Sequence, residues 1–139
     1  MPIYQTSNEE ETSALAAKIA ATCKGGEVFL LHGPLGAGKS QFARGFIKAL
    51  AGDKTDVPSP TFTILQTYDT EKGPIFHFDL YRLHNPEEVI EIGWEDAISG
   101  RNIVLAEWPE RAGSFIPKRA RNIRITTGAG SEREISIDE

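Results

Sequence analysis

Phosphate-binding chemistry is indicated by one stretch of eight residues, Gly33 to Ser40, which reads GPLGAGKS. It fits the pattern G-x-x-x-x-G-K-[ST], the P-loop of nucleotide-binding proteins. Gly36 and Gly38 allow the backbone to turn its N–H groups inward toward an anion. Lys39 can reach the β- and γ-phosphates, and the Ser40 hydroxyl can ligate Mg²⁺. The alternative is an ordinary glycine-rich turn between a strand and a helix.

The residues on either side of this stretch have the patterns that a P-loop requires. Before it, Val28 to His32 form a short apolar run typical of a buried strand. After it, apolar residues recur at the spacing of one helix face and end before Gly52; they are Phe42, Ala43, Phe46, Ile47 and Leu50. Because strand, glycine loop and helix follow in the required order, we predict that the protein binds a nucleotide.

An acidic side chain is needed beside a P-loop to organise Mg²⁺ and water, and two acids have a suitable setting. Glu107 ends the continuously apolar run Ile103 to Ala106, which is typical of a central parallel strand. Asp79 lies in the run Ile75 to Tyr81, which we expect to pair antiparallel with Thr61 to Tyr68. We assign Glu107 to magnesium, and Asp79 to orienting the attacking water or closing the magnesium shell. The alternative for each acid is that it only caps the turn after its strand.

The segment Pro58-Ser59-Pro60-Thr61 has the form of a nucleotide sensor. A threonine after a stiff proline-containing loop can reach Mg²⁺ or the γ-phosphate and register its loss. The same residues would serve equally well as a rigid entry to the strand that begins at Thr61. Spacing alone does not separate these two interpretations. Trp108, directly after Glu107, is likewise open to a place near the nucleotide or to a packing role.

The rest of the chain supplies supporting elements. Ser7 begins a capping-box pattern, which predicts a helix to about Thr22. Short helices are expected over Glu87 to Ile92 and Glu95 to Ile98, and an irregular segment over Pro109 to Pro117. Arg121 to Thr127 and Glu132 to Asp138 alternate around a glycine-rich turn, which predicts a C-terminal hairpin. We expect residues 1–139 to form a single P-loop domain.

Composition limits the classes of partner. The net charge of −5 does not suit direct binding to nucleic acid, and the mild basic cluster at Lys118, Arg119, Arg121 and Arg124 is expected to be solvated surface. Cys23 is the only cysteine, so no intramolecular disulfide forms, and its neighbours place it in the core. The sequence has no apolar run long enough for a membrane span and no signal-peptide pattern, so we expect a cytoplasmic protein without membrane contact.

Four motifs occur in order along the chain: GPLGAGKS at 33–40, SPTFT at 59–63, HFDLYR at 77–82 and EWP at 107–109. Together they closely resemble TsaE (the YjeE family), the bacterial ATPases required for threonylcarbamoyladenosine synthesis on tRNA. The resemblance spans nearly the whole chain. Ser40 stands where threonine is common in the family, and either hydroxyl can ligate Mg²⁺.

The resemblance implies an α/β, P-loop NTPase-like domain of three layers, with a mixed central sheet and helices on both faces. It implies binding of ATP and Mg²⁺, and hydrolysis that is weak alone and coupled to a complex with TsaB and TsaD. Those partners carry the transfer of threonylcarbamoyl to adenosine 37 of tRNAs that read codons starting with A, so tRNA is met only indirectly.

The resemblance also implies roles for individual residues. Ser40 and Glu107 would ligate Mg²⁺. Thr61 would be the switch threonine and Asp79 a catalytic acid, with Lys39 acting beside them. The phosphates would be held by Leu35, Gly36, Ala37, Gly38, Lys39 and Ser40.

Three other functions fit parts of the pattern. A GTPase is the nearest, but guanine readers usually carry an Asn-Lys-x-Asp segment, which this sequence does not have. A small nucleotide kinase would usually need more chain for a lid and an acceptor site. A nucleotide-gated binding module with negligible turnover would still use Thr61 to gate partner contacts, whereas loss of Asp79 would change little.

Overall fold

Seven strands form one sheet in the computed structural model, which describes residues 2–138. Their order is β1-β7-β6-β2-β5-β4-β3. The central strands β6, β2, β5 and β4 are parallel, whereas β7 pairs antiparallel with β6 and β1, and β3 antiparallel with β4. The mixed sheet is therefore confirmed. The strands are β1 (Ile3–Thr6), β2 (Val28–His32), β3 (Leu65–Tyr68), β4 (Ile75–Asp79), β5 (Ile103–Glu107), β6 (Arg121–Thr127) and β7 (Arg133–Ile137).

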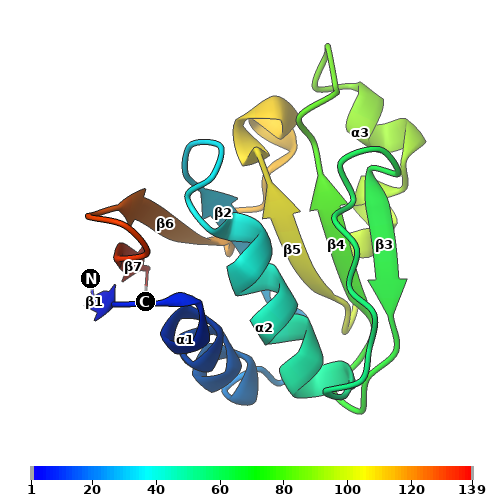
Figure 1. Cartoon of the computed structure of the whole chain (residues 1–139). Coiled ribbons are helices and arrows are strands. Elements are labelled where there is room, and N and C mark those ends of the chain that lie inside the picture. The colour runs from blue at the N-terminus through cyan, green and yellow to red at the C-terminus, as the bar shows by residue number, and fades with distance from the viewer. Residues whose placement is uncertain (1, 139) are drawn as a thin grey trace.

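Helices cover both faces of this sheet, as expected for three layers. The long helices α1 (Glu9–Ala21) and α2 (Lys39–Ala51) lie side by side across one face (Figure 1). The other face carries the short helices α3 (Glu88–Glu91) and α4 (Trp94–Ala97) and the 3-10 segment η1 (Pro109–Phe115). Because β5 is covered on both sides, all five of its residues are buried. Glu107 is therefore held at the end of a central strand, as its apolar run predicts.

The two ends of the chain differ from the sequence expectation. Asn8, not Ser7, caps α1: its side-chain oxygen accepts the Glu11 N–H at 2.8 Å, and the Glu11 carboxylate accepts the Ser7 N–H at 2.7 Å. The predicted capping box is thus wrong by one residue. Before it, the unpredicted strand β1 pairs with β7, and together with the predicted C-terminal hairpin it extends the sheet beyond β6.

The first predicted hairpin strand is shorter than expected. We predict a strand from Thr61, but residues 60–64 form a turn closed by the Ile64 N–H, which donates to the Pro60 carbonyl at 2.7 Å. Ile64 has a φ of +70°, which ends strand geometry, so β3 begins only at Leu65. The antiparallel pairing of β3 with β4 is confirmed. The turn has a functional consequence because it brings Thr61 beside the end of β4.

Several smaller expectations are also settled. The two short helices are separated at Gly93 as predicted, and Trp94 anchors the second one in the core. The segment predicted to be irregular contains 3-10 turns over Pro109–Phe115, which a non-helical Gly113 with a φ of +53° interrupts. Cys23 is a core residue, and burial raises the pKa of its thiol to about 12, so it is not a nucleophile at neutral pH. Within residues 2–138, no helix is long and apolar enough to cross a membrane.

The basic cluster lies at the surface as predicted, with Lys118, Arg119 and Arg124 exposed and Arg121 partly buried, and its arginines also contact neighbouring elements. The Arg119 guanidinium donates to the Gly26 carbonyl at 3.1 Å, and that of Arg121 donates to the Asp138 carbonyl at 3.0 Å. Arg124 lies 3.7 Å from a carboxylate oxygen of Asp138. Asn122 donates two hydrogen bonds to the Asp138 carboxylate, one from its backbone N–H and one from its side-chain amide, and both lower the pKa of Asp138. These arginines therefore tie neighbouring elements together at the surface of the protein.

Helices α1 and α2 approach closely at Gly45. A Cβ added there would lie 2.7 Å from the Ser13 Cα and 2.9 Å from the Ser13 carbonyl oxygen. An alanine normally stabilises a helix interior by about 1 kcal/mol over glycine. We expect Gly45→Ala instead to lower the free energy of unfolding by about 1–3 kcal/mol, because the helices must separate. Urea unfolding measures the change, with Ala49→Gly on the exposed face of α2 as the control for propensity. A stabilised Gly45→Ala protein would contradict the expectation.

Candidate functional site

The predicted P-loop connects β2 to α2 and has the backbone geometry of an anion-binding loop. Gly36 and Gly38 have φ values of +80° and +103°, a region that residues with side chains rarely adopt. Gly33 passes so close to β6 that a Cβ would lie 2.7 Å from the Ile125 carbonyl oxygen. Lys39 is the first residue of α2, so the N–H groups and the positive end of the helix dipole face the loop.

A pocket of about 330 Å³ opens at this loop. It collects residues from the P-loop and from the ends of β4 and β5, together with the start of α1 and the turn before β7. The predicted site residues that line it are Leu35, Gly36, Gly38, Lys39, Ser40, Thr61, Asp79 and Glu107. Ala37 does not line the pocket, since its side chain is fully buried. Trp108 does, which favours a place near the ligand over packing alone.

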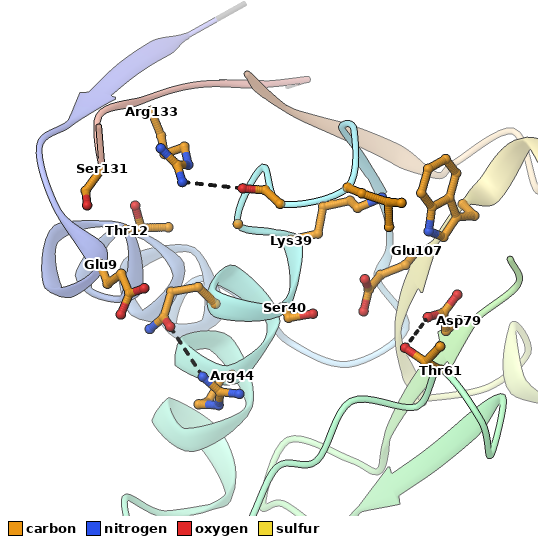
Figure 2. A pocket seen from close by; sticks show the side chains of 15 residues that line it. Glu9, Thr12, Lys39, Ser40, Arg44, Thr61, Asp79, Glu107, Ser131 and Arg133 are labelled. Carbon is orange, nitrogen blue, oxygen red and sulfur yellow. Dashed lines mark hydrogen bonds between the residues drawn. The ribbon is translucent and has the colours of Figure 1, made fainter. Parts of the chain in front are cut away.

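The two acids lie next to each other at the carboxyl edge of the sheet. Asp79 and Glu107 are direct neighbours in the parallel register of β4 and β5, and both are buried. In Figure 2 both carboxylates, with Ser40 and Thr61, face the space beside Lys39. The His77 Nε2–H donates to Glu107 Oε2 at 2.7 Å, which fixes that carboxylate and leaves Oε1 for another partner. Hard cations such as Mg²⁺ prefer this kind of oxygen.

Asp79 is held by two neighbours. Its Oδ1 accepts the backbone N–H of Tyr81 at 3.0 Å, and its Oδ2 accepts the Thr61 hydroxyl at 3.2 Å. Asp79 therefore caps the turn after its strand with Oδ1 only, because Oδ2 faces Thr61 and the pocket. Thr61 is tied in addition to Ser59, with 2.7 Å between their hydroxyl oxygens. The predicted sensor segment thus meets the predicted catalytic acid.

Lys39 has an unusual environment. Its side chain is buried, and Nζ has no hydrogen-bond partner among residues 2–138. It lies 3.5 Å from the centroid of the Trp108 ring. Burial lowers the pKa of Lys39, and the charges of Glu107, Asp79 and Glu110 act in the opposite direction. A buried ammonium without an acceptor costs free energy, and phosphate oxygens would supply acceptors. The donor set therefore fits a polyphosphate.

The protein side chains at this place are too few to hold Mg²⁺ alone, so a bound phosphate would have to supply further oxygen ligands. Within the described part of the chain, no group of three or more His, Cys, Asp or Glu side chains is arranged to hold a metal ion. Ser40 and Glu107 would then be the protein ligands, with phosphate and water oxygens completing the shell. This is how Mg²⁺ usually binds at nucleotide sites. His32, at the end of β2, has a structural contact, because its Nε2 lies 2.7 Å from Asn122 Oδ1.

Arg133 is a site residue that the sequence analysis missed. It comes from β7, and its Nε donates to the Ala37 carbonyl at 2.7 Å. Its Nη2 lies 3.4 Å from the Gly36 carbonyl oxygen (Figure 2). By holding two carbonyls of the P-loop away from the pocket, it helps turn the N–H groups inward. One arginine in an alternating strand carries no motif, so only the sheet order reveals it. The far end of the pocket is lined by Glu9, Thr12, Arg44 and Ser131.

Comparison with known sequences gives consistent matches. The family described as "Threonylcarbamoyl adenosine biosynthesis protein TsaE" matches residues 6–135. Three similar proteins, all named tRNA threonylcarbamoyladenosine biosynthesis protein TsaE, come from Rickettsia felis, Rickettsia bellii and Bacillus subtilis. The first is 50% identical over 103 residues, which is 74% of this chain and 60% of that protein. The second is 48% identical, covering 79% and 76%, and the third 38% identical, covering 96% and 83%.

The length of the matched segment and a structural comparison add to these matches. The matched segment spans about 60% of the length of the Rickettsia felis and Rickettsia conorii proteins. The similarity extends to three dimensions, since the crystal structure of Bacillus subtilis YdiB superposes with a TM-score of 0.81 at 33% identity. That alignment covers 98% of this chain and 83% of the YdiB chain. The fold is therefore shared over almost the whole length of the chain.

Proposed function

The chain belongs to the TsaE family of threonylcarbamoyl adenosine biosynthesis proteins, and from this premise we propose that it binds and hydrolyses ATP in tRNA threonylcarbamoyladenosine biosynthesis. One observation carries the proposal. The buried Lys39 ammonium, without a hydrogen-bond acceptor in residues 2–138, lies in the same pocket as the adjacent acids Asp79 and Glu107. A cation that lacks an acceptor and a pair of carboxylates beside it suit a phosphate chain with its metal ion.

The residues divide the work as follows. The N–H groups of the P-loop and the ammonium of Lys39 bind the β- and γ-phosphates. Ser40 and Glu107 would hold Mg²⁺, which would supply positive charge to neutralise the phosphate oxygens. Asp79 orients the attacking water, because its position is fixed by the Tyr81 N–H and its second oxygen faces the pocket. Most of the catalytic effect then comes from placement and charge, as is usual for phosphoryl transfer.

The proposed role in tRNA modification is indirect. The net charge of −5 argues against a tRNA surface on this protein. Adenosine 37 of tRNAs that read codons starting with A would instead be modified by a complex with TsaB and TsaD. Turnover by the isolated protein is expected to be weak and to rise in that complex. Reconstitution with both partners and tRNA tests this role, and modification that proceeds equally well without this protein would contradict it.

A metal-site prediction follows from the His77–Glu107 pair. We expect Glu107→Ala to raise the Mg²⁺ concentration needed for half-maximal ATP binding, because a metal ligand is lost. We expect His77→Leu to raise it about tenfold, because the carboxylate loses the donor that orients it. His77→Gln keeps an N–H donor at that place and should stay close to wild type. A fluorescent ATP analogue titrated with Mg²⁺ gives these values, and an unchanged titration for Glu107→Ala would remove it from the metal site.

A second candidate, nucleotide-gated binding of partners, is favoured by the contacts of Thr61. The Thr61 hydroxyl is held by Ser59 and Asp79, and the next residue, Phe62, is 83% exposed. A γ-phosphate with its Mg²⁺ would compete for this hydroxyl and so reposition an exposed aromatic side chain. Gating of this kind requires no turnover, because binding of the nucleotide alone moves the loop.

The gate is expected to depend on Thr61. Wild-type protein should bind a TsaB–TsaD complex with different affinities in the ADP form and in the form with a non-hydrolysable ATP analogue. Thr61→Ala should erase most of this difference, because the nucleotide then has no differential contact with the loop. Calorimetry measures both affinities, with Thr63→Ala, an exposed neighbour, as the control. Equal wild-type affinities in the two nucleotide forms would rule out the gate.

A further inference from the structure

The Lys39 ammonium has an aromatic partner that no phosphate-binding motif explains. Nζ lies 3.5 Å from the centroid of the Trp108 ring, which is within the range of a cation–π interaction. Nζ is buried and makes no hydrogen bond within residues 2–138. It also forms no ion pair with Glu107 or Asp79 in the described chain, although both carboxylates line the same pocket. The indole face is therefore the main contact that holds this charge.

Trp108 is itself held in a costly conformation. Its φ of +57° and ψ of +50° place it in the left-handed region, which few residues with side chains adopt. Tyr81 packs against it with 5.0 Å between ring centroids, and the Arg111 guanidinium lies 5.5 Å from the Tyr81 ring. Backbone strain of this kind persists only where the surroundings enforce it and concentrates at functional sites. The position of the indole over the lysine is thus built by the fold.

A lysine at this place has stronger partners available. A buried ammonium and a carboxylate attract each other strongly at short range, and Glu107 and Asp79 line the same pocket as Lys39. If the ammonium paired with Glu107, the nucleotide would have to break that pair before either group could act. The Mg²⁺ ligand and the phosphate-binding cation would then block each other in the empty site.

We propose that Trp108 is a positioning residue, whose ring holds the Lys39 ammonium away from Glu107 and Asp79 until phosphate oxygens take it over. The inference rests on the proposed function, since it assumes that a nucleotide is the incoming ligand. A cation–π contact suits this role because it stabilises the charge without a directional hydrogen bond and is weaker than a charge-assisted bond to phosphate. The lysine can therefore leave the ring at small cost when the ligand arrives.

The proposal makes a statement about the nucleotide-free protein. Protons on the Lys39 ε-carbon should resonate upfield of ordinary lysines, because they lie over an aromatic ring. Saturation with ADP should move this resonance toward the ordinary position. The signal is observed by NMR on protein with isotope-labelled lysine and is assigned by its loss in Lys39→Ala. In Trp108→Leu the nucleotide-free resonance should already lie at the ordinary position, and ADP affinity should fall about tenfold. Trp108→Phe keeps a weaker ring and should be intermediate in both.

The outcomes separate the inference from the proposed function. Backbone amide signals of Gly36 and Gly38 report whether ADP binds at all. If they respond while the Lys39 resonance stays ordinary or does not move, the inference is overturned and nucleotide binding stands. Trp108→Leu protein that keeps its amide spectrum and binds ADP as tightly as wild type overturns it as well. If no amide responds to ADP, the proposed function fails first and the inference with it.

Discussion

Asp79→Asn is expected to reduce ATP turnover about 100-fold or more and to leave ATP affinity nearly unchanged. Asparagine preserves the size of the side chain and an oxygen for the Tyr81 N–H, so the turn after β4 should persist. It removes the negative charge that would orient the attacking water and accept its proton. An interaction that forms mainly in the transition state affects turnover and not binding. Turnover is measured with the TsaB–TsaD complex present, and affinity by titration with a non-hydrolysable ATP analogue.

Two further variants make this experiment decisive. Asp79→Ala should show the same turnover defect, with some added loss of stability because the Tyr81 N–H and the Thr61 hydroxyl lose an acceptor. Asp69→Asn changes an exposed acid and should behave as wild type. A parallel loss of affinity and turnover in folded Asp79→Asn would move Asp79 into the binding shell. Unchanged turnover would instead favour the gated binding module.

Lys39→Met should weaken ATP binding about tenfold to a hundredfold, because a charge-assisted contact with the phosphates contributes about 1.5–3 kcal/mol. The nucleotide-free protein should be at least as stable as wild type. The variant removes a buried ammonium that has no hydrogen-bond acceptor within residues 2–138, and methionine fills similar space against Trp108. Calorimetric ATP binding and thermal unfolding without nucleotide measure the two effects.

The prediction is specific because ATP affinity is expected to fall while the stability of the nucleotide-free protein does not. A structural lysine would lose stability on substitution, whereas a ligand-binding lysine loses affinity and relieves a cost in the empty site. Lys48→Met, later on α2, is the control and should leave ATP affinity unchanged. A variant with clearly lower stability and full affinity would show that Lys39 is a packing residue.

Strong local patterns were sufficient to predict the elements that carry the main site residues. The apolar run before Glu107 predicts a central strand because both of its faces are covered, and β5 has this form. The glycines of the P-loop are predictable because only a residue without a side chain readily adopts their φ values. From these elements the proximity of Lys39 and Glu107 follows, since parallel strands end at the same edge of a sheet.

Features set by contacts between distant segments were not predictable. Residues 61–64 have the β-branched composition of a strand, but the turn closed by Pro60 and Ile64 overrides that preference. Arg133 reaches the P-loop only because the C-terminal hairpin lies next to the P-loop strand in the sheet. The hydrogen bond of His77 to Glu107 depends on the register of β4 against β5, which periodicity does not give.

The most direct test of the central claim, that this pocket binds ATP through its P-loop, is displacement of a fluorescent ADP analogue from the isolated protein in the presence of Mg²⁺. ATP and ADP are predicted to displace the analogue at clearly lower concentrations than GTP, and Lys39→Met should shift all of these curves to higher concentration. Displacement by GTP at equal or lower concentration would contradict the assignment as an ATPase. Failure of ATP to displace the analogue, or curves that are identical for wild type and Lys39→Met, would contradict nucleotide binding at this site.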